Sequence, residues 1–348
     1  MTLFLLACTP PVLMCLTYFF HPQDVLAMGL VLGGVACFLK KRWVLAGVLL
    51  GLAVCSQQYA VLVGAALIVA APCRMAKVKL GAGALLSVTI VDLSVILATS
   101  GRAVKAVFLG SSLVGGNFRS AGGTILWETR VSGLPLFVIS RLAPVVVVIA
   151  IAWWLARRLG PKLLEPVPLM SLVATSLSVR LMFEENLFGY YFMSVAVALV
   201  LLDVVGGRLR GQVLAWIGLV TLAFNPEHLG LLSNLTNWAS GLSAGIPIFL
   251  LALSLSSVAL DAYRKTYRLY KLVWIVVVSL TCEYTIFGRV RPLVHVPHWL
   301  WQVVLVTTAA ALAMDPLFEH FRSADVEKGL ASDVTTFHRA FDSGRYTD

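Results

Sequence analysis

The sequence predicts an all-α integral membrane protein that crosses the bilayer about ten times. Only 13% of its 348 residues are charged, whereas 59% are hydrophobic. An average soluble chain carries about twice this share of charge, so too few charged side chains remain to cover a soluble surface. The apolar runs are nearly continuous and lack the alternation of barrel strands, which favours helices. These observations exclude a soluble enzyme, a disordered chain and a nucleic-acid-binding domain.

Apolar runs of about 20 residues mark the expected spans. They lie near residues 2–20, 23–39, 80–99, 134–156, 167–182, 187–204, 211–225, 239–260, 272–287 and 298–315. The first run lacks the basic start and the small-residue cleavage site of a signal peptide, so we expect it to be a span. The predicted transmembrane domain therefore covers residues 1–315, with an outer loop at 100–133. Residues 316–348 are expected to form a cytoplasmic tail.

One further apolar stretch, residues 43–71, is interrupted by Ser56-Gln57-Gln58-Tyr59. Each arm has about a dozen residues, which is too short to cross a bilayer alone. Basic residues flank the stretch on both sides, at 40–42 and at 74–79. The positive-inside rule places both flanks in the cytoplasm, which predicts a re-entrant pair of half-helices. A single long tilted helix is the alternative, and it would put one basic flank outside.

The distribution of basic residues predicts the orientation. With the re-entrant pair in place, fifteen Lys and Arg residues fall on cytoplasmic turns and eight on the outer side, so both termini are expected in the cytoplasm. The turns include Arg157, Arg158, Lys162, Arg208 and Arg210. The net charge of +10 is therefore mainly a topology signal, and the expected partner is the lipid bilayer and not nucleic acid. The six cysteines show no CxxC spacing, which indicates neither a disulfide framework nor a metal site.

The predicted outer face is rich in arginine. Seven of its eight basic residues are Arg, whose planar guanidinium binds phosphate with two parallel hydrogen bonds. This bias indicates an anionic, phosphorylated ligand. The basic candidates are Arg119 in the long outer loop, Arg180, Arg289, Arg291 and His295. For the last three, contact with lipid headgroups is the alternative.

Carboxylates accompany these cations on the same face. In His21-Pro22-Gln23-Asp24, the Pro and the acid fit the start of a helix. The functional alternative is that His21 and Asp24, one turn apart, face a shared outer cavity in which Asp24 serves as a base or substrate anchor. Glu184 and Glu185 are further candidates, although Glu184 is also spaced to pair with Arg180 at a helix end.

Polar residues at membrane depth add to the candidate site. Gln57 and Gln58 lie where the half-helices break, and broken helices usually line a cavity. Asp92 lies within a predicted span, where an acid is a functional-site hypothesis by default. Its expected partner is an Arg or a Gln of the half-helix pair, and a buried structural hydrogen bond is the alternative. Tyr190 and Tyr191 are typical of anchors at the membrane interface.

A family resemblance rests on residues 21–72. The polar box His21–Asp24, the basic turn Lys40–Arg42 and the segment AGVLLGLA (Ala46–Ala53) resemble the GT-C superfamily of polytopic glycosyltransferases. They look most like the bacterial mannosyltransferases that use polyprenol-phosphate mannose. The later segment RLMFEENLFGYYF (Arg180–Phe192) is similar to a downstream segment of that family.

The resemblance implies a GT-C-like fold in a bacterial plasma membrane. It also implies transfer of a sugar, expected to be mannose, from a polyprenyl-phosphate donor to an acceptor hydroxyl on the extracytoplasmic face, with no cofactor or metal. Such chemistry needs a carboxylate that takes the acceptor proton and cations that stabilise the departing phosphate. The catalytic candidates are Asp24, Glu184 and Glu185; the substrate-binding candidates are His21, Gln57, Gln58, Arg119, Arg180, Arg289, Arg291 and His295.

One departure from the family pattern concerns the catalytic acid. Family members begin with further spans and a long outer loop that carries this acid, and no residue here corresponds to it. Three explanations fit: a longer coding sequence, an inactive relative, or a takeover of the role by Asp24, Glu184 or Glu185. A non-catalytic membrane protein (a transporter, a lipid-linked sugar binder or an assembly partner) is the alternative class, because broken helices and intramembrane acids also occur in transporters.

Overall fold

A computed structural model of the chain describes residues 20–102, 141–184, 189–207, 210–213 and 305–321, with isolated positions at 12, 15–16, 216–217, 220 and 303. Every regular element among the described residues is helical and none is a strand, which confirms the all-α prediction. Four helices, including a 3₁₀ extension of one of them, are long and apolar enough to cross a membrane: Pro22–Leu39, Arg74–Ala98, Ala143–Leu164 and Pro166–Phe183. The described part of the chain is therefore that of a helical membrane protein.

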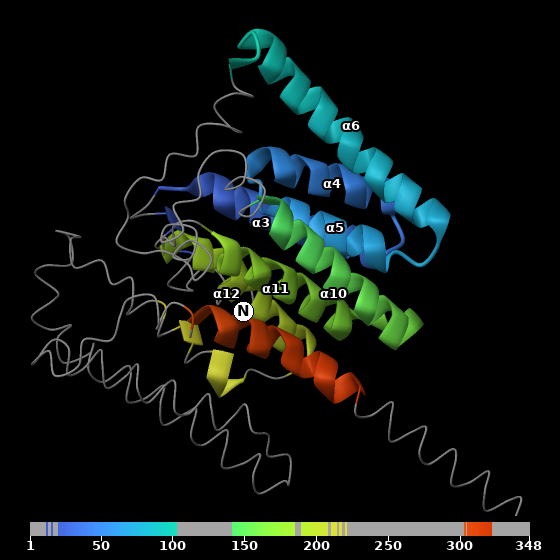
Figure 1. Cartoon of the computed structure of the whole chain (residues 1–348), viewed down its shortest axis with the longest axis vertical. Helices are drawn as coiled ribbons and strands as arrows, with labels where there is room; N and C mark the ends of the chain where they lie inside the picture. Colours follow the sequence, from blue (N-terminus) through green and yellow to red (C-terminus); the bar gives the residue numbers. More distant parts are fainter. Residues whose placement is uncertain are drawn as a thin grey trace, which may run out of the picture.

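The helices between residues 22 and 98 follow one another with short turns, and so do those between residues 143 and 183 (Figure 1). In chain order they are α3 (Pro22–Leu39), α4 (Trp43–Ser56), α5 (Ala60–Ala70), α6 (Arg74–Ala98), α10 (Ala143–Leu159), the 3₁₀ helices η3 (Gly160–Leu164) and η4 (Gly189–Tyr191) on either side of α11 (Pro166–Phe183), and α12 (Phe192–Val205). A last helical segment covers residues 305–321.

The apolar runs locate several of these helices closely. The predicted spans 23–39 and 167–182 agree with α3 and α11, each of which begins at a proline that fits the first helical turn. Residues 305–321 continue past the predicted end at 315, and Leu317 is fully buried there.

Two predicted starts differ from the structure. Helix α6 begins at Arg74 and not at the expected residue 80. The long side chains of Lys and Arg can extend their charged ends to water, so the helix continues beyond its apolar part. Helix α12 begins at Phe192, after the 3₁₀ turn η4, and not at the expected 187. The predicted spans near 239–260 and 272–287 lie outside the described residues, as do nearly all of 2–20 and most of 211–225.

The interruption predicted within residues 43–71 is confirmed, because α4 ends at Ser56 and α5 begins at Ala60. Gly47 lies against Leu80 of α6, and one turn later Gly51 lies against Ser87. The contacts advance in the same direction along both helices, so α4 and α6 run parallel. The chain must therefore return along α5, and the single long helix considered as an alternative is wrong.

Glycines allow α4 and α6 to approach each other closely. A Cβ on Gly47 would overlap the carbonyl oxygen of Leu80, and a Cβ on Gly83 would meet the carbonyl oxygen of Val44. Neither obstacle is a flexible side chain, so a larger residue would push the two backbones apart. Small residues spaced one turn apart are the usual means of close helix packing in membranes.

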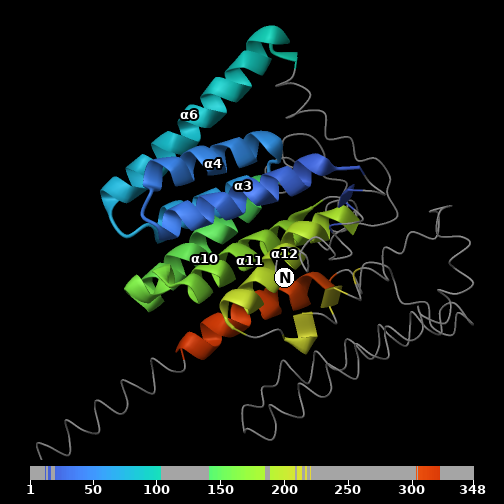
Figure 2. The ribbon, with the colours of Figure 1, turned by 180° about the vertical axis from the view of Figure 1, so that it is seen from behind.

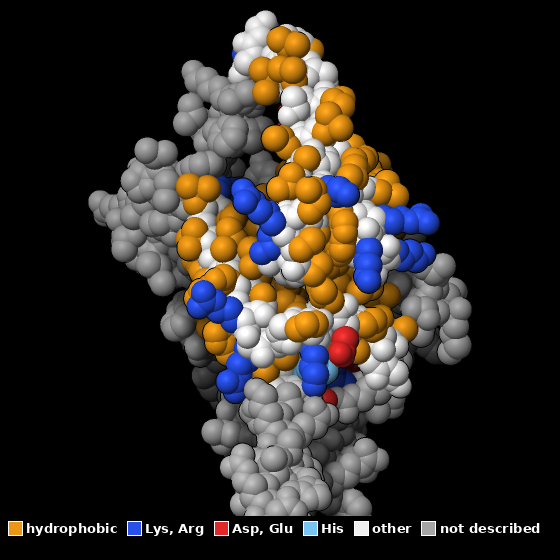
Figure 3. All heavy atoms as spheres, turned by 90° about the vertical axis from the view of Figure 1, so that its right-hand side faces the viewer, with side chains coloured by type: hydrophobic (Ala, Val, Ile, Leu, Met, Phe, Trp, Pro, Cys, Tyr) orange, Lys and Arg blue, Asp and Glu red, His pale blue; other side chains and the backbone are white. Residues whose placement is uncertain are grey.

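The hairpin brings the basic flanks to one end of the molecule, here called the basic end. It is formed by the α3–α4 turn, the α5–α6 turn and the end of α10 with η3. Its basic residues are Lys40, Lys41, Arg42, Arg74, Lys77, Lys79, Arg157, Arg158 and Lys162. Figure 3 views the molecule from this side, where Lys and Arg side chains surround an apolar surface and few acidic ones are in view.

Helix α11 occupies the centre of the described structure. Every residue from Pro168 to Leu181 is buried, and the helix packs on α5, α10 and α12. Its serines fit this position because they are small and return hydrogen bonds to their own helix, as Ser176 Oγ does to the carbonyl of Leu172 (2.8 Å). Helix α6 instead leans away from the others toward its C-terminal end (Figures 1 and 2), and its Leu85, Ile90 and Leu97 are exposed.

Candidate functional site

A cavity of about 750 Å³ lies at the end of the helices opposite the basic end. We call it the Arg180 cavity. It is bounded by the start of α3, the α4–α5 turn, the C-terminal half of α6, the start of α10, the end of α11 and η4. Its polar and aromatic lining residues are His21, Gln23, Cys55, Ser56, Gln57, Gln58, Tyr59, Asp92, Arg141, Arg180, Glu184, Tyr190 and Tyr191. Six separate chain segments therefore supply one polar site.

An ion-pair cluster forms one wall of the cavity. Arg180 Nε donates to Glu184 Oε1 at 2.7 Å, across one turn at the end of α11. Arg141 adds a second cation, with its Nη1 3.7 Å from Glu184 Oε2. Arg180 and Glu184 thus form the ion pair at a helix end that their spacing suggested as the alternative to a functional role. Both residues also line the cavity. Arg180 and Arg141 thus share one carboxylate, and Asp24 also lies within electrostatic reach of Arg180.

The Arg180 guanidinium is held between two aromatic rings. Its carbon lies 4.5 Å from the centre of the Tyr59 ring and 4.4 Å from that of Tyr191. Arg180 is only 8% exposed, and its Nη1 has no hydrogen-bond partner among the described residues. A buried guanidinium nitrogen without an acceptor is costly, so Nη1 is a polar atom of the site that the described protein groups leave unsatisfied.

Asp24 lies behind the cavity wall and not on it. The residue is 1% exposed and is absent from the cavity lining. Gln57 Nε2 donates to its Oδ2 (3.1 Å), and the Tyr59 hydroxyl donates to its main-chain oxygen (2.9 Å). Asp24 thus ties the start of α3 to the α4–α5 turn. The expectation that His21 and Asp24 both face the cavity holds for His21 only.

An aromatic stack continues the wall from Tyr191 to His21. The His21 ring stacks on Tyr190 with 4.1 Å between centroids, and Tyr190 meets Tyr191 edge to face at 4.5 Å. Gln23 Nε2 donates to His21 Nδ1 at 2.7 Å, which requires that nitrogen to be unprotonated. The two tyrosines were expected at the membrane interface, but their rings lie in the cavity wall. Flat aromatic and imidazole surfaces of this kind suit the apolar faces of a ligand.

A second carboxylate, Asp92 of α6, reaches the cavity from its far side. It is half-buried, and its nearest polar neighbour among the described residues is the thiol of Cys55 at the end of α4. The partner comes from the half-helix pair as expected, but it is a cysteine and not an Arg or a Gln. Parallel packing of α4 and α6 explains the pairing, because the Gly51–Ser87 contact lies one turn earlier on both helices.

The predicted site residues thus divide into three groups. His21, Gln57, Gln58, Arg180 and Glu184 line one cavity, and Asp24 supports it from behind. The others, Glu185, Arg119, Arg289, Arg291 and His295, lie outside the described residues.

Reasoning from the sequence missed Arg141, Tyr59 and Gln23 as site residues. For Arg141 a signal existed, since it is a lone cation in a long apolar run just before the Pro144 that opens α10. For Tyr59 and Gln23 the role depends on partners on other elements or on ring orientation, which spacing does not reveal.

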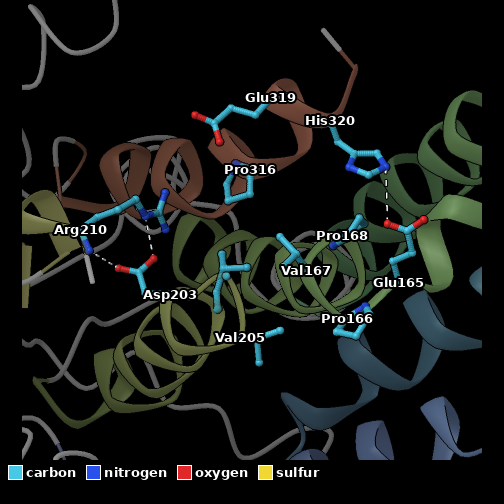
Figure 4. A pocket seen from close by; sticks show the side chains of 12 residues that line it. Glu165, Pro166, Val167, Pro168, Asp203, Val205, Arg210, Pro316, Glu319 and His320 are labelled. Carbon is cyan, nitrogen blue, oxygen red and sulfur yellow. Dashed lines mark hydrogen bonds and ion pairs between the residues drawn. The ribbon is translucent and has the colours of Figure 1, made fainter. Parts of the chain in front are cut away.

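A second cavity, of about 670 Å³, lies at the basic end and is here called the Arg210 cavity (Figure 4). Arg210 Nε donates to Asp203 Oδ1 (2.6 Å), while its Nη1 donates to the carbonyl of Leu312 (2.9 Å) and lies 3.3 Å from Asp315. At the rim, His320 approaches Glu165 at 3.8 Å. Arg210 was counted as a cytoplasmic basic residue, but it is 8% exposed and joins α12 to residues 305–321.

Comparison with known proteins leaves the chain without an assigned family, because no family model, curated protein or solved structure matches it. The class defined here is therefore structural: a helical membrane protein with a polar, arginine-containing cavity at one end. Among the described residues no group of three or more His, Cys, Asp or Glu side chains is arranged to hold a metal ion.

Proposed function

We propose that this chain is a membrane glycosyltransferase with a GT-C-like fold of about ten spans. It transfers a sugar, mannose by preference, from a polyprenyl-phosphate sugar to an acceptor hydroxyl. The observation that carries the proposal is Arg180, a buried cation on the cavity wall whose Nη1 lacks a hydrogen-bond partner among the described residues. A phosphate oxygen is the acceptor that suits such an atom best.

The remaining wall supplies the other groups that sugar transfer needs. Arg141 places a second cation near Arg180 through their shared partner Glu184. Together they suit a phosphate that gains negative charge as it leaves. The stacked rings of His21 and Tyr190 suit an apolar sugar face. Val61, Leu62 and Val145 make the neighbouring wall apolar, as a prenyl chain requires.

The orientation is part of the proposal. The basic end faces the cytoplasm and the Arg180 cavity opens to the extracytoplasmic side, since short basic turns are retained inside. In a cysteine-free background, we expect Arg102→Cys, at the end of α6 near the cavity, to react with an impermeant thiol reagent added outside intact cells. Lys41→Cys and Arg158→Cys are expected to react only after the membrane is opened. Reversed labelling would place the cavity on the cytoplasmic side and overturn this orientation.

Transfer itself is tested with labelled donor. Membranes containing the wild-type chain, supplied with polyprenyl-phosphate [¹⁴C]mannose, are expected to move label from the organic-soluble donor to an acceptor fraction. Membranes from cells carrying an empty vector are the control. Transfer no greater than this control would contradict the enzymatic function. Donor binding without transfer would instead favour the lipid-linked sugar binder.

A further inference from the structure

The Arg180 cavity contains two carboxylates on its wall, Glu184 and Asp92, and a third, Asp24, behind it. These three differ in accessibility and in their partners. Those differences decide which of them is able to take a proton from a substrate hydroxyl.

Asp24 is poorly placed to meet a substrate. It is 1% exposed, and its Oδ2 already accepts the hydrogen bond from Gln57. Its main-chain oxygen is bonded to the Tyr59 hydroxyl as well. These contacts make Asp24 a positioning residue that fixes the α4–α5 turn, on which Gln57, Gln58 and Tyr59 reach the cavity.

Glu184 lines the cavity, but cations hold both of its oxygens. Oε1 accepts from Arg180 at 2.7 Å, and Oε2 lies 3.7 Å from Arg141. Neither oxygen therefore meets a substrate hydroxyl without displacing an arginine. Protonation of Glu184 would also release the two arginines from their common partner, just when they are needed for the leaving phosphate.

Asp92 has the accessibility and the environment that the other two lack. It lines the cavity and is half-buried, and among the described residues its polar contact is the neutral thiol of Cys55. No ion pair joins it to a basic side chain of the described chain, so no cation occupies its oxygens. Asp92 stands on α6 and the Arg180–Glu184 pair at the end of α11, so the two groups reach the cavity from different helices.

We propose that Asp92 is the catalytic base of the Arg180 cavity and that Asp24 is a positioning residue. This inference rests on the proposed function. The Asp92 carboxylate removes the proton from the acceptor hydroxyl as the acceptor oxygen bonds to the anomeric carbon. The bond between that carbon and the phosphate oxygen breaks, and its electron pair leaves with the polyprenyl phosphate. The negative charge lost at Asp92 thus appears on the phosphate, beside Arg180 and Arg141.

The test compares turnover and donor binding in three variants and the wild type. Asp92→Asn is expected to lower kcat by about 10²-fold or more, the usual contribution of a general base, while binding of polyprenyl-phosphate mannose stays unchanged. Asp92→Glu is expected to recover part of the rate because it restores a carboxylate. Ser94→Ala, on the same helix and exposed, is the matched control and should retain the wild-type rate.

Folding separates chemistry from structure. Asp92→Asn is expected to reach the same folded fraction as the wild type in the same micelles. If its loss of turnover is matched by a loss of folded protein, Asp92 is structural and the base role is wrong.

Failure of this inference is distinguishable from failure of the proposed function. An active wild type with an equally active Asp92→Asn overturns the role of Asp92 alone. An inactive wild type overturns the proposed function and the base with it. A readout independent of turnover is added by cysteine labelling in a cysteine-free background: Asp92→Cys should react with a small polar thiol reagent and Asp24→Cys should not. The opposite pattern would make Asp24 the accessible carboxylate.

Discussion

Replacing Arg210 by methionine is expected to lower the free energy of unfolding by about 3–5 kcal/mol, the range for breaking a buried ion pair on one side. Asp203 and Asp315, which are 3% and 5% exposed, would lose the cation that lies between them. The carbonyl of Leu312 would lose its donor too. To measure this change, the purified protein is unfolded in mixed micelles by increasing amounts of denaturing detergent. Tryptophan fluorescence reports the folded fraction.

Two further variants make this result specific to the buried network. Arg74→Met alters an exposed arginine of the same basic end and is expected to change stability by about 0.5 kcal/mol or less. The triple variant Arg210→Met, Asp203→Leu, Asp315→Leu replaces the whole network by apolar groups and is expected to recover most of the loss. An Arg210→Met protein as stable as Arg74→Met would mean that the network does not attach residues 305–321 to α12.

The same network marks a limit of reasoning from charge along a sequence. The positive-inside rule counts each Lys and Arg by its position, and Arg210 was counted in that way. Its acidic partners lie 7 and 105 residues away in the chain. No local pattern identifies the second of them, because that contact exists only once residues 305–321 pack beside α12.

Local patterns did locate the helices and their interruption. Prolines at the start of an apolar run fixed the beginnings of α3 and α11. The polar stretch between two short apolar arms, with basic flanks on both sides, predicted the α4–α5 hairpin. These features depend on length, hydropathy and backbone chemistry within one segment, and are therefore readable from the sequence alone.

The sequence predicted several residues of the candidate site, but it did not predict how their side chains are arranged in it. Polar residues at membrane depth are few, so His21, Gln57 and Arg180 were identifiable as unusual. Which of the carboxylates meets the cavity depends on the rotation of α3 and α6 about their axes. The sequence therefore named Asp24 as a base candidate, whereas the structure places it behind Gln57 and leaves Asp92 on the cavity wall.

Replacing Arg180 by methionine is expected to lower the rate of sugar transfer by about 10²–10³-fold, the usual cost of removing one preorganised donor that stabilises transition-state charge. Under the proposed function Arg180 is the cation that meets the phosphate charge, and its replacement also removes the Nη1 donor, which has no partner among the described residues. Initial rates of label transfer at saturating donor measure the effect. Arg180→Lys is expected to recover little of the rate, since an ammonium keeps the charge but not the planar fork or the stacking between Tyr59 and Tyr191.

Arg180→Met also removes the closest partner of Glu184, so its effect on transfer could be purely structural. A separate comparison tests this. Glu184→Gln breaks the same ion pair but leaves the Arg180 guanidinium in place. If Arg180 acts on the phosphate, Glu184→Gln should lose stability comparably but retain far more transfer. Equal losses of transfer in the two variants would mean that the pair supports the end of α11 and that Arg180 has no direct part in the reaction. The two variants are compared in the same micelles at matched folded fractions. The ratio of their transfer rates then reports the contribution of the guanidinium to catalysis, separately from the contribution of the ion pair to folding.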